Sequence, residues 1–262
     1  VYAAPGLPRP VDLSMRSKTA ALYGLPTIVD YEHLASRRFA DLYVWMTSGR
    51  RAKSALSWIR STHRVPRERR IFDLLATRWV VTGPTGADLP LALTPRWSDG
   101  HYQVLENEQA LPRAFFVPEA AVVADPEARL RTLTSLEHDA RQLALLESLP
   151  ADGFLGRPGG RGQATIASSR SEELVVQVEA TEEGFLFVSD QHYPGWVATV
   201  NGEPAPIVRA NHAFRLVRVP AGPSTVAFQY RPWSVRAGAV ISLATLAGLV
   251  AWGAHRRRSR VS

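Results

Sequence analysis

The sequence predicts an α+β protein: a mixed α/β N-terminal part is followed by an antiparallel β-sandwich and one C-terminal transmembrane helix. Three observations support this. Helix caps and short apolar strands alternate over residues 1–152, short strands separated by turn residues fill 163–232, and a long apolar run follows. We expect 153–162 to be a linker, 233–254 to be the membrane helix and 255–262 to be a basic cytoplasmic tail.

The N-terminal part combines helix and strand signals. Gly24 and Gly49 each follow a helical stretch, and Pro66 suits the first turn of another helix, where its missing N–H is not needed. The residues 77–82 form a short apolar run that Gly83 and a proline stop. We expect helices over 14–23, 32–46, 66–75, 126–133 and 139–149, and strands over 77–82, 102–106 and 113–117.

Residues 153–162 are rich in glycine and arginine. The alternative reading, a phosphate-binding loop, lacks a following Gly-Lys-Ser/Thr and a strand-to-helix context, so a flexible linker is predicted. Beyond it, strands are predicted over 174–180, 184–188, 196–200, 213–219 and 225–230, and Asn201-Gly202 is typical of a tight hairpin turn. About six antiparallel strands at this spacing predict a small β-sandwich.

The final apolar run extends from Trp233 to Trp252, with Arg236 as its only charged residue. At ~1.5 Å per residue it would span roughly 28 Å, close to the ~30 Å hydrocarbon core of a bilayer. A buried helix of a soluble domain is the alternative. The bracketing tryptophans and the arginines that follow favour a membrane span whose C-terminal end is cytoplasmic. The globular part is then extracytoplasmic, and because Val1 is not a start methionine and no signal peptide follows it, we expect further spans upstream.

Composition excludes several classes of function. The chain has no cysteine, which excludes disulfides, thiolate metal sites and cysteine nucleophiles. Its net charge is +7, but Arg256, Arg257, Arg258 and Arg260 account for four of those charges. Basicity is therefore largely a property of the tail, and no nucleic-acid partner is expected.

A long ordered run, from Ser189 to Pro232, resembles the C-terminal signature of the YfhO-type bacterial membrane proteins. Three upstream pieces, over 22–34, 74–83 and 105–118, agree in the same order. The chain departs from the family at Asp30-Tyr31-Glu32-His33, where the family usually has Gly-Tyr-Asp-Pro.

The resemblance implies a GT-C-like polytopic glycosyltransferase, in which many membrane spans precede an extracytoplasmic domain. It implies transfer of a sugar from a polyprenyl-phosphate carrier to an envelope polymer such as teichoic acid. The catalytic acid of such enzymes lies near the first spans, so no catalytic residue is assigned and this chain alone is expected to be inactive. The expected partners are the lipid bilayer, the missing N-terminal spans and an envelope glycopolymer. The alternative is a non-catalytic carbohydrate-binding or structural extracytoplasmic domain of a polytopic membrane protein.

Two turns supply the candidate substrate-binding residues. Tyr193-Pro194-Gly195-Trp196 presents two aromatic rings beside His192, a combination that suits stacking against a sugar. The same rings would equally serve to pack the edge of the sandwich. Arg209 offers a planar fork for a phosphate or carboxylate, and Asn211 tolerates a left-handed turn. An ordinary hairpin with a paired arginine is the alternative there.

The densest group of titratable residues in the first part consists of Asp30, Glu32 and His33. No HExxH motif or paired-histidine spacing accompanies it, so a solvated loop or helix N-terminus is the prediction, and no metal site is expected. No cofactor is expected in this chain, apart from the polyprenyl-phosphate sugar donor that the resemblance implies.

Overall fold

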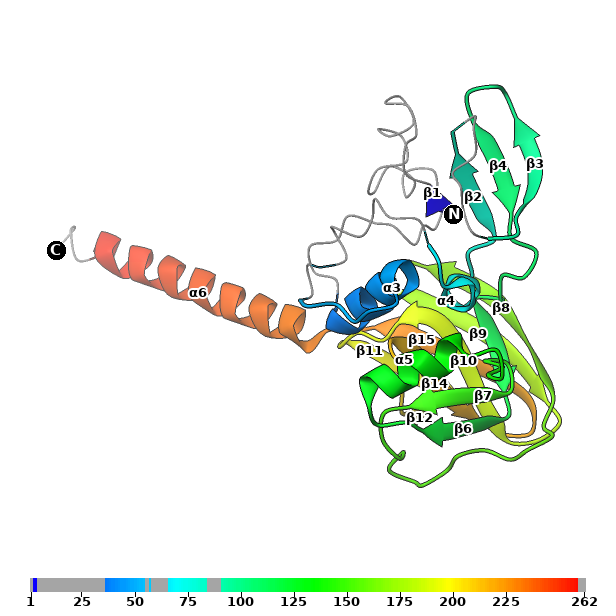
Figure 1. Cartoon of the computed structure of the whole chain (residues 1–262). Coiled ribbons are helices and arrows are strands. Elements are labelled where there is room, and N and C mark those ends of the chain that lie inside the picture. Colours follow the sequence, from blue (N-terminus) through cyan, green and yellow to red (C-terminus); the bar gives the residue numbers. More distant parts are fainter. Residues whose placement is uncertain (1, 4–35, 55–56, 58–65, 84–90, 259–262) are drawn as a thin grey trace.

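The computed structural model describes residues 2–3, 36–54, 57, 66–83 and 91–258. The predicted helix over 14–23 and the Asp30, Glu32 and His33 group lie outside the described residues. The predicted α+β class is confirmed, and most of the strands lie in antiparallel sheets. Figure 1 shows two large stacked sheets, helices against one of them, a smaller sheet to one side and a long C-terminal helix that projects away.

The two large sheets form the β-sandwich. The six-stranded sheet has the order β5-β10-β14-β13-β7-β6, and the five-stranded sheet has the order β12-β11-β15-β9-β8. All neighbours pair antiparallel except β6 and β7, which are parallel. The six-stranded sheet contains β5 (Ala114–Val117), β6 (Glu119–Val122), β7 (Leu143–Leu146), β10 (Gly184–Gln191), β13 (Val208–Ala210) and β14 (Phe214–Val219). The five-stranded sheet contains β8 (Gly162–Arg170), β9 (Glu173–Ala180), β11 (Trp196–Val200), β12 (Glu203–Ala205) and β15 (Gly222–Tyr230).

The inner faces of the two sheets meet in an apolar core. Alternate residues of β9, from Leu174 to Ala180, face Phe116, Leu186 and Val217 of the six-stranded sheet. The Phe116 ring packs directly against the backbone of Gly162 and Gly184. A Cβ on Gly162 would lie 2.6 Å from this ring, and a Cβ on Gly184 would lie 2.5 Å from it. Only glycine fits at those two positions.

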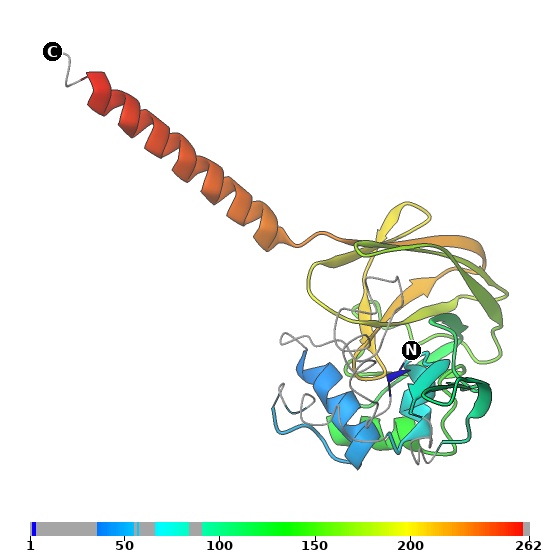
Figure 2. The same cartoon turned by 90° about the horizontal axis from the view of Figure 1, so that it is seen from above.

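Helices cover the opposite face of the six-stranded sheet. They are α3 (Arg37–Ser48), α4 (Arg69–Leu74) and α5 (Pro126–Thr134). Ser36 caps the start of α3 by accepting a hydrogen bond from the Phe39 N–H, and Gly49 ends it in the left-handed conformation. Their buried side chains join those of β5, β10 and β14 in a second core. The six-stranded sheet is therefore the middle of three layers, as Figure 2 shows from above.

A smaller four-stranded sheet has the order β1-β2-β4-β3. It contains β1 (Tyr2–Ala3), β2 (Trp79–Thr82), β3 (Thr94–Ser98) and β4 (Gln103–Glu106). The strands predicted over 77–82 and 102–106 correspond to β2 and β4, whereas β3 was not predicted.

The helix predicted over 139–149 is wrong, because β7 occupies its centre. Leu143–Leu146 is a continuous apolar run, and a run this short fits a strand buried on both faces as well as a helix. The sandwich also extends beyond the predicted range 163–232, since β5, β6 and β7 precede it in the chain. The division at 153–162 stays a prediction, although strands from both sides of that segment share one sheet.

The C-terminal helix α6 (Trp233–Arg258) confirms that the end of the chain is helical. Its apolar side chains are exposed, with Ile241, Leu243 and Leu246 each retaining 59% or more of their accessible surface. The alternative of a helix buried in the domain is therefore wrong. Within the described residues no helix combines the length and hydropathy needed to cross a bilayer, so the transmembrane prediction is not confirmed.

Candidate functional site

Three arginines converge on one carboxylate just beyond the C-terminal end of β7, in the middle layer. Arg38 Nη2 lies 2.9 Å and Arg129 Nη2 3.1 Å from Glu147 Oε1, while Arg209 Nη1 lies 3.2 Å from Oε2. His192 and His212 contact two of the same arginines. We refer to these six residues as the Glu147 cluster.

The fold brings the Glu147 cluster together from distant parts of the sequence. Glu147 directly follows β7, and Arg209 lies on the neighbouring strand β13, where Ala210 pairs with Leu146. Arg38 lies in the first turn of α3, and Arg129 on the buried side of α5. The helices that cover the sheet thus place two of the three guanidinium groups at the end of β7.

Arg129 is the buried arginine of the cluster, with a fully inaccessible side chain. Its Nη1 donates to the Val123 carbonyl and, at 3.3 Å, to that of Ala124. Burial lowers the pKa of Arg129, the carboxylate of Glu147 opposes that shift, and the charge of Arg38 adds to it. The guanidinium is thus held in place by backbone oxygens and by the carboxylate of Glu147.

His212 joins the cluster to a second acid. Its Nδ1 faces Arg129 Nη2 at 3.4 Å, and because arginine only donates, Nδ1 must accept and the proton belongs on Nε2. That Nε2 lies 3.4 Å from Asp41 Oδ2. Burial lowers the pKa of His212, so the ring is neutral near pH 7. Burial also raises the pKa of Asp41, but contacts with His212 and Arg51 outweigh it and bring the pKa to about 2.

His192 and Arg209, both predicted from the sequence, do lie together. Arg209 Nη2 is 3.5 Å from His192 Nδ1. Burial and then the charge of Arg209 lower the pKa of His192, which favours the neutral ring. The hypothesis of an ordinary arginine-acid pair at Arg209 is also correct in part, because Glu147 is its partner, but that acid is shared with two further arginines.

Asn211 has a structural role. It adopts the left-handed conformation that the sequence suggested, with φ of 45°. Its side chain is buried, and Oδ1 accepts a 2.8 Å hydrogen bond from the Leu145 N–H. Asn211 thereby extends the pairing between the turn after β13 and β7.

Trp196 is partly buried and packs against the core of the sandwich. The Arg215 guanidinium lies 3.8 Å from the centre of the Trp196 indole, and the Tyr230 ring lies 5.5 Å from the indole between centroids. Arg215 is buried, and burial lowers its pKa to about 10. Tyr193, by contrast, is 40% exposed. The structure therefore brings Arg209 and His192 together. Trp196 and Asn211 do not share one open surface with them.

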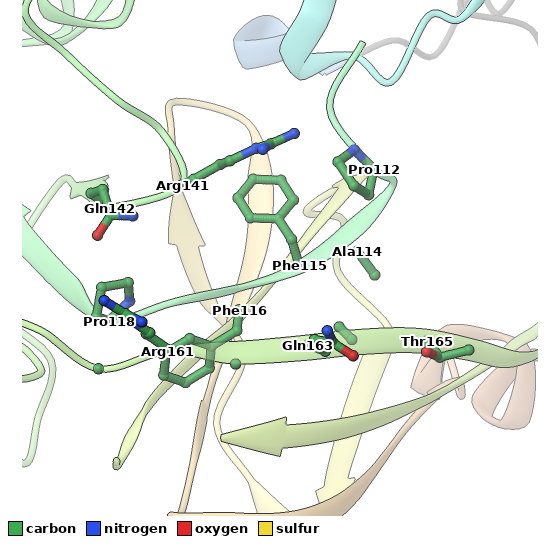
Figure 3. A pocket seen from close by; sticks show the side chains of 13 residues that line it. Pro112, Ala114, Phe115, Phe116, Pro118, Arg141, Gln142, Arg161, Gln163 and Thr165 are labelled. Carbon is green, nitrogen blue, oxygen red and sulfur yellow. The ribbon is translucent and has the colours of Figure 1, made fainter. Parts of the chain in front are cut away.

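A groove of about 430 Å³ opens between the edge strands β5 and β8. Figure 3 shows Phe115 and Phe116 on opposite sides of β5, with Arg141 and Arg161 near one end of the groove. The predicted site residues do not line it. In the part of the chain described here, no three His, Asp or Glu side chains are grouped to hold a metal ion.

Sequence reasoning missed Arg38, Arg129 and Glu147. Glu147 was assigned to a helix that is absent, and nothing local links it to an arginine 62 positions later. Asp125-Pro126 is a sequence signal that bears on Arg129. An N-cap followed by proline fixes where α5 begins, and the start of the helix determines which of its residues face the sheet.

The fold defines a three-layer α+β sandwich whose last strand leads into an exposed apolar helix, an arrangement that suits a domain held beside a membrane. Residues 161–242, from the start of β8 into α6, match the family described as bacterial membrane protein YfhO. The resemblance is thereby confirmed over less than half of the chain, and membrane localisation is supported. The chain has no match among curated proteins or solved structures.

Proposed function

We propose that this chain is the extracytoplasmic region of a membrane-bound GT-C-type glycosyltransferase that transfers sugar from a polyprenyl-phosphate carrier to an envelope polymer such as teichoic acid. The supporting observation is the family match that runs without a break from the sandwich into α6. The catalytic acid belongs to upstream membrane spans, and the chain described here positions substrate beside them.

We also propose that α6 anchors this region in the bilayer, with the C-terminus in the cytoplasm and the sandwich outside. Between residues 235 and 249 its large apolar side chains are 59% or more exposed, so nothing in the described chain covers them. An apolar surface of this extent requires either lipid or other helices as a neighbour.

The test uses the longer membrane protein expected to contain this chain, reconstituted in vesicles with a radiolabelled polyprenyl-phosphate sugar and teichoic acid. Label is expected to appear in the polymer. The Arg209→Gln variant should transfer less label while inserting normally, and Arg131→Gln, an exposed arginine paired with Glu127, is the matched control. Polymer binding without transfer would instead establish the second candidate.

That second candidate is a non-catalytic carbohydrate-binding or structural domain. The observation in its favour is that Trp196 and Asn211 both serve internal packing. If the protein transfers sugar, a Trp196→Phe variant tests the role of the indole: full transfer shows that it serves packing alone, whereas lost transfer in a stable protein assigns it to substrate.

A further inference from the structure

We infer that the Glu147 cluster is a binding site for a phosphate group. The first argument is charge. Arg38, Arg129 and Arg209 contribute three positive charges and Glu147 one negative charge, while the lowered pKa values leave His192 and His212 neutral. Within the described residues the cluster thus carries two uncompensated positive charges. A phosphate monoester, with a charge of about −1.5 to −2 near pH 7, would balance them.

Other charged groups remove only part of this excess. Asp125, at the start of α5, also attracts Arg129 and offsets part of the charge. Asp41, on the other side of His212, is paired with both Arg37 and Arg51. These three residues together carry one net positive charge, so Asp41 does not neutralise the Glu147 cluster. A partly buried region with this imbalance is costly unless an anion joins it.

The second argument is the number of donors. Each guanidinium offers about five N–H donors, and a carboxylate accepts about four hydrogen bonds, so Glu147 cannot satisfy three arginines. Arg129 Nε is buried and has no partner among the described residues. Arg38 and Arg209 retain 28% and 34% of their side-chain surface, so they remain open to a ligand from solvent.

Access and rigidity fit this inference. Arg129 is fixed by the carbonyls of Val123 and Ala124, so its fork is already oriented before an anion arrives. The two partly exposed arginines lie on different elements, α3 and β13, and both reach the same carboxylate. Glu147 then acts as an internal competitor that occupies the site in the absence of ligand.

The position of the cluster suggests the source of the phosphate. His192 begins the loop that joins the two sheets, and three residues later the Gly195 carbonyl accepts a 2.6 Å hydrogen bond from the Arg231 N–H, just before α6. The cluster is therefore at the end of the sandwich from which α6 leaves. The choice of a lipid-linked phosphate rests on the proposed membrane anchoring, whereas the phosphate site itself rests on the contacts alone.

The experiment measures binding to the full chain in detergent micelles by calorimetry, at constant ionic strength. The probes are inorganic phosphate and farnesyl monophosphate. Saturable binding is expected for wild type. Arg209→Gln and Arg38→Gln should each weaken it at least tenfold, while Arg131→Gln should leave it unchanged. Glu147→Gln should tighten it several-fold, because the competing charge is removed while an acceptor oxygen remains.

The tightening in Glu147→Gln is the outcome that a purely structural cluster would not produce. Tighter binding of farnesyl monophosphate than of inorganic phosphate, with the same dependence on Arg209, assigns the site to a lipid phosphate. Equal binding of the two probes supports a site for soluble phosphate. Absence of saturable binding, or equal effects of Arg209→Gln and Arg131→Gln, overturns the inference. Because only binding is measured, that failure would leave the transferase proposal standing.

Discussion

Replacing Trp196 by alanine should destabilise the sandwich without any ligand being present. The indole covers the buried Arg215 guanidinium at 3.8 Å, and Arg215 Nε donates to the Gln191 carbonyl at 3.0 Å. Loss of the ring removes a desolvated cation–π contact worth about 2 kcal/mol and leaves a cavity beside a buried charge. We expect a total loss of about 3 to 5 kcal/mol in the free energy of unfolding.

The assay is urea unfolding of the full chain in mild detergent, followed by circular dichroism. In a thermal melt of the same sample, a loss of this size in a protein of this length corresponds to a fall in Tm of roughly 6 to 20 °C. Trp196→Phe keeps a ring and should recover most of the difference. Trp97→Ala is the matched control, because Trp97 is 53% exposed on β3, and should change stability by less than about 0.5 kcal/mol. A Trp196→Ala variant as stable as this control would refute the packing role.

Three further outcomes are expected. The pKa of buried His212 lies below its ordinary 6.5, so on acidification the unfolded chain takes up a proton at this ring before the folded chain does. The stability that the neutral ring gives the fold is therefore complete above about pH 6.5 and is lost as pH falls from there through the folded-state pKa. The His212→Asn variant should show a smaller fall in Tm over that pH range than wild type does. Gly184→Ala places a Cβ 2.5 Å from the Phe116 ring and should cost about 1 to 3 kcal/mol in urea unfolding, while Gly248→Ala, with no atom within 4 Å, should not destabilise. If α6 enters lipid, Leu246→Arg should reduce co-flotation of the chain with vesicles, and unchanged flotation would contradict that anchoring.

The elements that local chemistry specifies were predictable from the sequence. Asn201-Gly202 was identified as a hairpin turn, and both residues have positive φ between β11 and β12. The glycine that ends α3 and the alternation along β9 were equally clear. In each case neighbours within a few positions determine the backbone, so one sequence is sufficient.

The candidate site was less predictable because its contacts are distant in sequence. Arg209 and His192 were identified as polar turn residues, but their common partner Glu147 required knowledge of the order of strands in the sheet. Trp196 and Asn211 were correctly placed near turns. Whether such side chains face inward depends on which sheet or helix packs against them. Sequence spacing alone does not contain that information.

The middle position of the six-stranded sheet has a consequence for how the chain reaches its native state. Strand β5 cannot pair until β10 exists, and Phe115 aligns with Phe187, seventy-two positions later. Closing so long a segment costs entropy before any pairing compensates for it, which slows assembly. Until synthesis has passed Gln191, β5 is an apolar segment without its strand partner, and β7 has only β6 beside it. Such segments aggregate readily, so we expect partially synthesised chains to require a chaperone more than the finished protein does.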